Sequence, residues 1–182
     1  KDAEAFAAKL DAVAKRNETI VAQQEAQRQK FIAAVRAADA LRDQRKFAEA
    51  TKAYEKVITQ AGATSAAAED ARWGMRELKM ILVCDDGEKL FAAGKYYEAR
   101  GRLQVAFDFE VACDARDRAR KLLPECEMGV RFTEACALVG QEGKGLDAIA
   151  ALESIVKDET YEGKFRALAE EKLKAIREGW QK

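Results

Sequence analysis

Cysteine is the residue type in this chain best suited to covalent chemistry, and it occurs four times, at Cys84, Cys113, Cys126 and Cys136. No two of them form a C-x-x-C pair. Cys126 and Cys136 would lie about 15 Å apart along one helix, which is too far for a disulfide. Because free cysteine often packs as a small apolar residue, we interpret all four as buried thiols of a reducing compartment, which favours the cytoplasm. A disulfide or a redox role is the alternative.

Histidine is absent from the whole chain. Its absence excludes Ser-His-Asp and Cys-His catalysis, HExxH zinc sites and covalent CxxCH haem attachment. Three acidic pairs, at 69–70, 85–86 and 170–171, lack the loop of oxygen ligands that calcium requires. The segment "GQEGKG" at 140–145 lacks the spacing of a phosphate-binding loop and is interpreted as a turn between helices. We therefore predict no catalytic residue, no metal site and no cofactor, and do not expect an enzyme.

The charge of the chain is balanced, with 32 basic and 32 acidic residues among 182. This balance gives no electrostatic argument for binding nucleic acid or an anionic membrane surface. The basic cluster at 116–121 is interleaved with acidic residues, so a salt-bridged helix surface is favoured over an anion-binding patch. No apolar run approaches the roughly 18–20 residues of a membrane span, so we expect no direct membrane insertion by this segment.

Helix-forming residues dominate the composition, and proline occurs once, which predicts an all-α fold. Three alanines, Ala50, Ala99 and Ala148, are 49 residues apart both times. Apolar or aromatic residues follow each of them at offsets of four, seven and eight: Tyr54, Val57 and Ile58, then Leu103, Ala106 and Phe107, then Leu152, Ile155 and Val156. These offsets trace one stripe of a helix and predict short helices at 47–60, 96–109 and 145–157. Small residues twelve positions before each alanine predict a closely packed antiparallel partner helix.

These spacings resemble the tetratricopeptide repeat (TPR). With each alanine as position twenty of that motif, the small, aliphatic, aromatic and bulky positions of the first two copies match: Ala38, Leu41, Phe47, Ala50 and Tyr54, then Gly87, Leu90, Tyr96, Ala99 and Leu103. In the third copy Gly145 replaces the aromatic residue. The resemblance covers roughly 31–160. It implies a right-handed stack of three antiparallel helix hairpins, a TPR-like solenoid.

The repeat of 49 residues is longer than the family's unit of about 34. The additional residues have no loop composition, so we predict elongated first helices, the second of which would be ~29 residues long. The corresponding helix that starts at Asp114 contains Pro124, which predicts a kink or a restart there. The segment 161–182 is predicted to be a C-terminal capping helix.

The first 44 residues predict one long N-terminal helix, whose end forms the first helix of the first hairpin. Part of it has an alternating spacing of four and three residues, a seam made of Phe6, Leu10, Val13, Asn17, Ile20, Gln24, Gln27 and Phe31. Such spacing is typical of a coiled coil, and polar seam residues often fix register and strand number. Pairing with a partner or with another copy of the chain is one interpretation. A long helix that packs on the chain's own hairpins is the other.

The resemblance also implies a protein-binding groove along the first helices of the hairpins. The positions that line it in the family correspond here to Ile32, Val35, Asp39, Arg42, Ile81, Cys84, Glu88, Phe91, Val130 and Thr133. Such a groove suits an apolar helix or an extended segment of a partner protein. The alternative is that the chain's own terminal helix fills it.

We expect a non-catalytic scaffold or assembly subunit that uses the groove and the long helix. One alternative is an enzyme or small-ligand binder that uses Cys84, although a reactive thiol needs a neighbouring cation and Cys84 precedes two aspartates. Another is a purely structural subunit with no exchangeable ligand. The chain begins at Lys1, which fits a removed signal peptide, a membrane-anchored parent chain or a trimmed segment, so the sequence leaves the compartment open.

Overall fold

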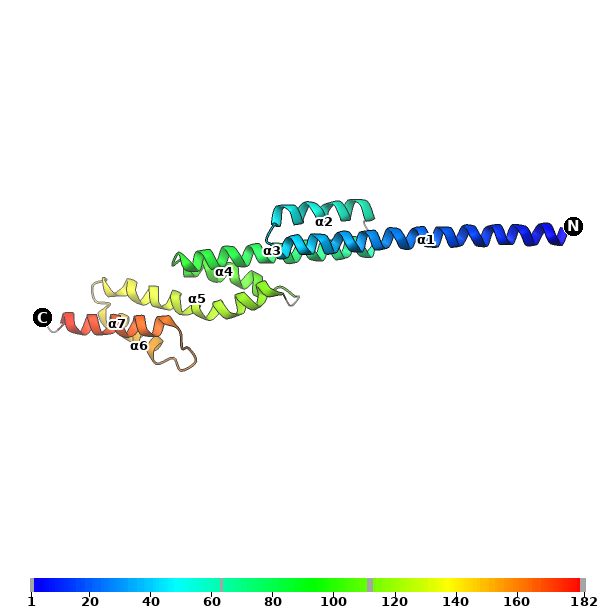
Figure 1. Ribbon diagram of the computed structural model, residues 1–182. Helices are drawn as coiled ribbons and strands as arrows, with labels where there is room; N and C mark the ends of the chain where they lie inside the picture. Colours follow the sequence, from blue (N-terminus) through cyan, green and yellow to red (C-terminus); the bar gives the residue numbers. More distant parts are fainter. Residues whose placement is uncertain (1, 63, 111–112, 181–182) are drawn as a thin grey trace. The chain divides into compact units, whose positions relative to one another are not determined.

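The computed structural model describes residues 2–62, 64–110 and 113–180. Within these ranges the chain forms seven helices and no strand, so the prediction of an all-α fold is confirmed (Figure 1). The helices are α1 (Asp2–Asp43), α2 (Phe47–Ala61), α3 (Ala66–Ala92), α4 (Tyr96–Phe107), α5 (Asp114–Val139), α6 (Gly145–Val156) and α7 (Lys164–Trp180).

Each helix packs against its neighbours in the sequence. α1 pairs with α2, α5 packs against α4 and α6, and α7 packs on both α5 and α6. In the pair of α3 and α4, Gly87 lies so close to Leu103 that an added Cβ atom would be 2.8 Å from the Cγ atom of the leucine. The predicted helix hairpins packed on their neighbours are therefore confirmed, while the right-handed twist stays a prediction.

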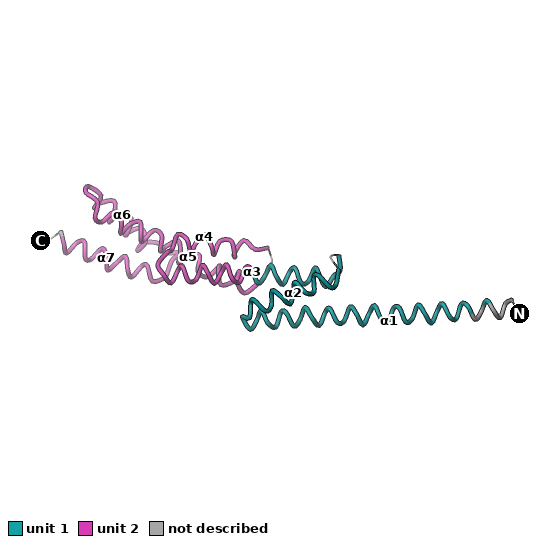
Figure 2. The backbone as a smooth tube through the Cα atoms, turned by 90° about the horizontal axis from the view of Figure 1, so that it is seen from above, with its two compact units in different colours: residues 1–78 teal, residues 79–182 magenta. Residues whose placement is uncertain are grey.

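The chain divides into two compact units, residues 1–78 and 79–182, with the division inside α3 (Figure 2). The first unit has one apolar core, built around Tyr54 and Val57. The second unit has two clusters, one around Leu103 and Ala119 and one around Leu152 and Phe165. The predicted hairpin array from 31 to 160 thus contains two separate packing units.

The corners between paired helices repeat in structure as well as in sequence. A left-handed backbone occurs at three positions 49 residues apart, with φ of 62°, 76° and 75° at Arg45, Gly94 and Gly143. The N–H groups of Lys46 and Lys95 each donate 2.9 Å hydrogen bonds to the carbonyl oxygens five residues earlier, of Leu41 and Leu90. This pattern is a Schellman C-cap. The 49-residue spacing in the sequence is therefore also the spacing from one helix corner to the next in the structure.

The repeating alanines lie where the sequence requires a small residue. Ala50, Ala99 and Ala148 are fully buried, and so are the residues four positions later, Tyr54, Leu103 and Leu152. The predicted apolar stripe of each short helix is therefore confirmed as its core-facing side.

Two predicted boundaries differ in the structure. α5 continues through Pro124 without interruption, so the alternative in which the helix restarts there was wrong. α7 begins at Lys164 instead of residue 161, because the buried Tyr161 precedes the helix. Its hydroxyl accepts a hydrogen bond from the backbone N–H of Phe165 (3.2 Å) and donates one to Glu125 (2.8 Å).

Candidate interaction surfaces

The first candidate surface is the N-terminal stretch of α1. Residues 9–30 are all exposed, whereas Phe31, Val35 and Ala38 pack in the core of the first unit. Figures 1 and 2 show that α1 runs far past the end of its partner helix α2. We call residues 6–30 the projecting helix. At the helical rise, residues 9–30 of the projecting helix span about 33 Å.

The apolar part of the predicted seam lies along the projecting helix and faces water. Phe6, Leu10, Val13 and Ile20 are exposed by 63%, 55%, 55% and 41%. Val21, exposed by 63%, widens the stripe, and the strict 4–3 spacing missed it. The sequence signal that could have located Val21 is its position directly after the seam residue Ile20.

The other seam residues divide at the end of the projecting helix. Asn17, Gln24 and Gln27 are exposed, whereas Phe31 packs against the core of the first unit. The seam is therefore apolar toward the N-terminus, polar in its middle and intramolecular at its last position.

The second candidate surface is the predicted groove, and its members do not share one environment. In the first unit, Ile32, Val35 and Asp39 of α1 line a pocket of about 480 Å³ with Trp73 of α3. The Trp73 side chain is 39% exposed. The sequence did not single out Trp73, because it lies in the added part of the repeat, for which the family motif has no position.

Arg42, the fourth predicted groove residue of this unit, is occupied by ion pairs. Its guanidinium lies 2.6 Å from Glu77 and 3.5 Å from Asp39, and the side chain is only 13% exposed. Asp39 also accepts a 2.5 Å hydrogen bond from the hydroxyl of the buried Tyr54. Burial is the main cause that raises the pKa of Tyr54, and the hydrogen bond to Asp39 is the second. The polar side of the groove is a closed network that links α1, α2 and α3.

In the second unit, Cys84 is fully buried, with its sulfur 3.9 Å from Glu88. Burial raises the pKa of the Cys84 thiol to about 11, and nearby Arg118 offsets part of that rise. Arg118 reaches across from α5 to Asp85 (2.5 Å) and Glu88 (2.8 Å) of α3. The expected salt-bridged character of the basic cluster is confirmed at Arg118, which pairs with Asp114 on its own helix (3.3 Å) as well as with Asp85 and Glu88 on α3.

The remaining groove residues lie in other surroundings. Ile81 and Phe91 pack against the core of the second unit. Phe91 also stacks edge-on with Tyr96 at 5.4 Å, and the ammonium group of Lys164 lies 4.3 Å from the Phe91 ring centre. Val130 and Thr133 line a separate pocket of about 340 Å³ with Gly94 and residues 95–98. Cys84, Glu88 and Phe91 are not among the residues that line that pocket.

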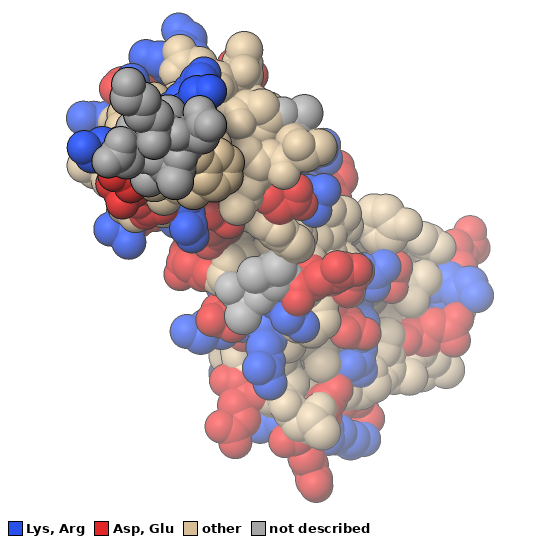
Figure 3. Space-filling view, turned by 90° about the vertical axis from the view of Figure 1, so that its right-hand side faces the viewer, with Lys and Arg blue, Asp and Glu red and all other residues tan. Residues whose placement is uncertain are grey.

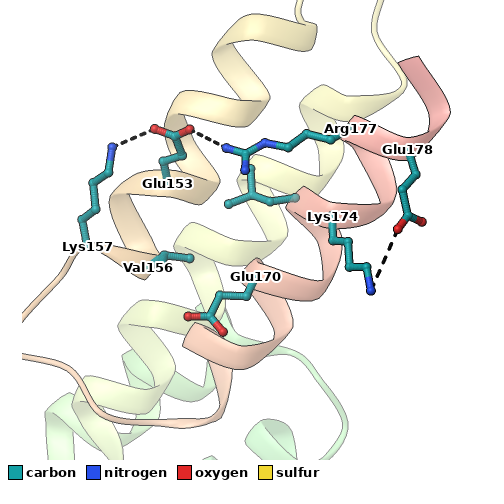
Figure 4. A pocket seen from close by; sticks show the side chains of 8 residues that line it. Glu153, Val156, Lys157, Glu170, Lys174, Arg177 and Glu178 are labelled. Atoms are coloured by element: carbon teal, nitrogen blue, oxygen red, sulfur yellow. Dashed lines mark hydrogen bonds and ion pairs between the residues drawn. The ribbon is translucent and has the colours of Figure 1, made fainter. Parts of the chain in front are cut away.

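A further pocket, of about 420 Å³, lies between α6 and α7 (Figure 4). Most of its charged residues satisfy one another. Glu153 accepts hydrogen bonds from Lys157 (2.8 Å) and Arg177 (3.0 Å), and Lys174 lies 3.9 Å from Glu178. Of these contacts, the one between Arg177 and Glu153 joins α7 to α6.

Acidic and basic side chains are interspersed on the face seen in Figure 3, with no extended field of one sign. Among the described residues, no group of three or more cysteine, aspartate or glutamate side chains is arranged to hold a metal ion. None of the described helices is long and apolar enough to cross a membrane.

No protein-family model, curated protein or solved structure matches the chain.

Proposed function

We propose that this chain is a non-catalytic assembly subunit whose projecting helix pairs with helices of other polypeptides. The observation that carries the proposal is the stripe of Phe6, Leu10, Val13, Ile20 and Val21 on a helix whose residues 9–30 are all exposed. The helix hairpins of the first unit hold the base of the projecting helix in place through Phe31 and Val35.

An apolar stripe that faces water adds little to the stability of its helix. Helices in proteins owe most of their stability to packing of that side, and intrinsic propensity alone is marginal. Complete burial of a Val, Leu, Ile or Phe side chain contributes about 1.5–3 kcal/mol. The five side chains are roughly half exposed, so covering them would contribute on the order of 5 kcal/mol per chain before the cost of association.

The properties of Cys84 do not support the alternative of a thiol enzyme. A nucleophilic cysteine must be a thiolate, and a thiol with a pKa of about 11 is almost wholly protonated at neutral pH. Its side chain is also fully buried. Protein binding in the groove of the first unit stays a prediction from the resemblance to the TPR family.

Site-specific photo-crosslinking in the full chain tests the proposal. A photoreactive residue at Val13 lies on the stripe, and one at Thr19 lies on the opposite side of the same helix, so the two form a matched pair. We expect a covalent product with another polypeptide from position 13 and little from position 19, in cells that produce the chain naturally. Equal yields from both positions, or no product from position 13 in a folded chain, would refute the proposal.

A further inference from the structure

We propose that the partner of the projecting helix is an amphipathic helix of a different polypeptide, with acidic residues along a flank of its own apolar stripe. This inference rests on the proposed function, because it names the chemistry of the partner. The arrangement of charge around the stripe carries it, and the polar seam residue Asn17 adds one requirement.

The two flanks of the stripe differ in charge. Lys9 and Arg16 each come directly before a seam residue, so they lie about 70° from the middle of the stripe on one side. Lys30 continues this flank two heptads after Arg16. Ala14 and Val21 each come directly after a seam residue and lie as far from the middle on the other side. One flank is therefore basic and the other is apolar along these positions, and all five residues are exposed.

The acidic residues of the projecting helix do not flank the stripe. Asp11, Glu18 and Glu25 lie about 130° from its middle, toward the side away from the stripe. Each has a basic residue three or four positions away, the spacing at which side chains on a helix meet. Lys15 is that neighbour for Asp11 and Glu18, and the Arg28 guanidinium lies 3.7 Å from the Glu25 carboxylate. The acidic charge is therefore balanced within the helix.

The cations of the basic flank have no such neighbours. At three and four positions before and after Lys9, Arg16 and Lys30, every residue is uncharged. Asp11 and Glu18 come two positions after the first two cations, which places them about 200° further round the helix. None of the three cations forms an ion pair with another residue that the structure describes. The positive charge of this flank is thus left for a partner to balance.

A second copy of this chain does not supply the missing acids. In a parallel pair, the basic flank of one copy faces the other flank of the second copy, which holds Ala14, Val21 and Arg28. In an antiparallel pair, the basic flank faces the basic flank of the second copy. Both orientations leave Lys9 and Arg16 opposite uncharged or like-charged residues, and like charges repel. The charge pattern therefore favours a different polypeptide.

The partner helix must also match the seam. Asn17 lies between the apolar seam residues Val13 and Ile20, and a wholly apolar partner would leave its amide without a hydrogen bond, at a cost of about 1–3 kcal/mol. A polar residue opposite Asn17 avoids that loss and fixes the register. Acidic residues of the partner, spaced seven positions apart, then face Lys9 and Arg16. Such charge pairs contribute little each and act mainly on the choice of partner.

An anionic membrane surface is a different target for an apolar stripe with a basic flank. Helices that lie on such membranes have a polar face rich in lysine and arginine. The polar face of the projecting helix instead carries Asp11, Glu18 and Glu25. These acidic residues favour a protein partner, and binding to vesicles is an outcome of the test.

Two synthetic peptides test the inference with the full chain. Both are helices of about four heptads, with the same apolar seam and one asparagine to face Asn17. They differ only in carrying glutamate or lysine along both flanks of the seam. Fluorescence anisotropy measures the affinity of each peptide for the chain. We expect the glutamate peptide to bind at least about tenfold more tightly than the lysine peptide.

Arg16→Glu and Lys15→Glu form a matched pair of variants. They change the net charge equally at adjacent positions, one on the basic flank and one opposite the stripe. We expect Arg16→Glu to reduce the preference for the glutamate peptide at least about threefold, and Lys15→Glu to leave it unchanged.

Equal affinities of the two peptides for the unsubstituted chain, or no binding of either, would overturn the inference. A preference of unchanged size in Arg16→Glu would also overturn it. Vesicles of phosphatidylserine form the third probe: binding to them that Arg16→Glu abolishes, without discrimination between the peptides, would assign the basic flank to a membrane instead.

The failure of this inference differs from the failure of the proposed function, and the photo-crosslink from Val13 separates the two. A product with the mass of two copies of this chain would keep the proposed function and reject a different polypeptide as the partner. The absence of any product from Val13 in a folded chain would reject both.

Discussion

Arg45 and Gly94 adopt the same left-handed backbone at consecutive corners, with φ of 62° and 76°. The left-handed conformation costs a residue with a Cβ atom roughly 1–2 kcal/mol, whereas glycine adopts it freely. The first corner therefore carries strain that the second avoids. A contact between the Arg45 guanidinium and the Phe47 ring, at 5.3 Å, offsets part of it.

The strain at the corner predicts opposite effects of two substitutions at equivalent positions. Arg45→Gly should raise the free energy of unfolding by about 0.5–1 kcal/mol, and Gly94→Ala should lower it by about 1–2 kcal/mol. No atom lies within 4 Å of a Cβ atom built on Gly94, so that loss reports backbone strain alone. Urea unfolding followed by circular dichroism measures both. A loss of stability in Arg45→Gly would show that the arginine's contacts outweigh the strain.

Substitution of Gly74 is also predicted to destabilise the chain, but because of close packing and not because of backbone strain. A Cβ atom at this position would lie 2.5 Å from the ring of Tyr54, whose ring is buried and whose hydroxyl is bonded to Asp39. Gly74→Ala should destabilise the chain by about 1–3 kcal/mol, as overpacking does. Gly101→Ala is the matched control, because Gly101 lies in α4 with open space around it. That substitution should be neutral or stabilising by up to about 1 kcal/mol. Equal effects in thermal unfolding would contradict the close packing at Tyr54.

The Cys84 thiol should make stability depend on pH in the alkaline range. Its folded pKa of about 11 lies above the ordinary value of 9.0, because burial disfavours the thiolate. A group whose pKa is raised by folding stabilises the protein below its unfolded pKa, and this contribution is lost as pH rises toward the folded pKa. The free energy of unfolding should therefore fall between pH 9 and about 11, by up to about 2–3 kcal/mol from this thiol. Cys84→Ala should flatten that slope. If the free energy of unfolding of Cys84→Ala fell with pH as steeply as that of the unsubstituted chain, a group other than Cys84 would be responsible.

Arg118 should differ sharply from a neighbour in the same basic cluster. Arg118→Met removes the guanidinium from the nearly buried Asp85, at 2.5 Å, and from Glu88. Breaking such a pair by removing one partner costs about 3 kcal/mol or more, so we expect a large loss of stability. Arg120→Met alters an exposed residue and should change stability by less than about 0.5 kcal/mol. Losses of equal size in chemical unfolding would mean that the cluster acts only as a charged surface.

The helices and their core-facing sides could be predicted because the evidence for them is local and periodic. Offsets of four and seven residues from Ala50, Ala99 and Ala148 fix one side of a helix, and those side chains are buried. The corners at Gly94 and Gly143 could be located in the same way, because glycine marks a left-handed residue. Arg45 could be placed only through the 49-residue spacing.

The groove residues show the limit of that reasoning. In the structure Ile32, Val35 and Asp39 line one pocket of the first unit, whereas Val130 lines a different pocket to which Cys84 does not contribute. The added residues of each repeat change which side chains meet, and a motif of about 34 residues has no positions for them.

The sequence by itself determined an all-helical chain, three equivalent corners and a seam along the first helix, because each depends on local residue types and on spacings that repeat along the chain. Only the tertiary structure decided that Arg118 joins α5 to α3, that Tyr54 lies on Gly74 and that residues 9–30 stay uncovered. Those relationships join residues far apart in the sequence, or depend on where a partner helix ends. They follow from how the helices pack, which periodicity alone does not specify.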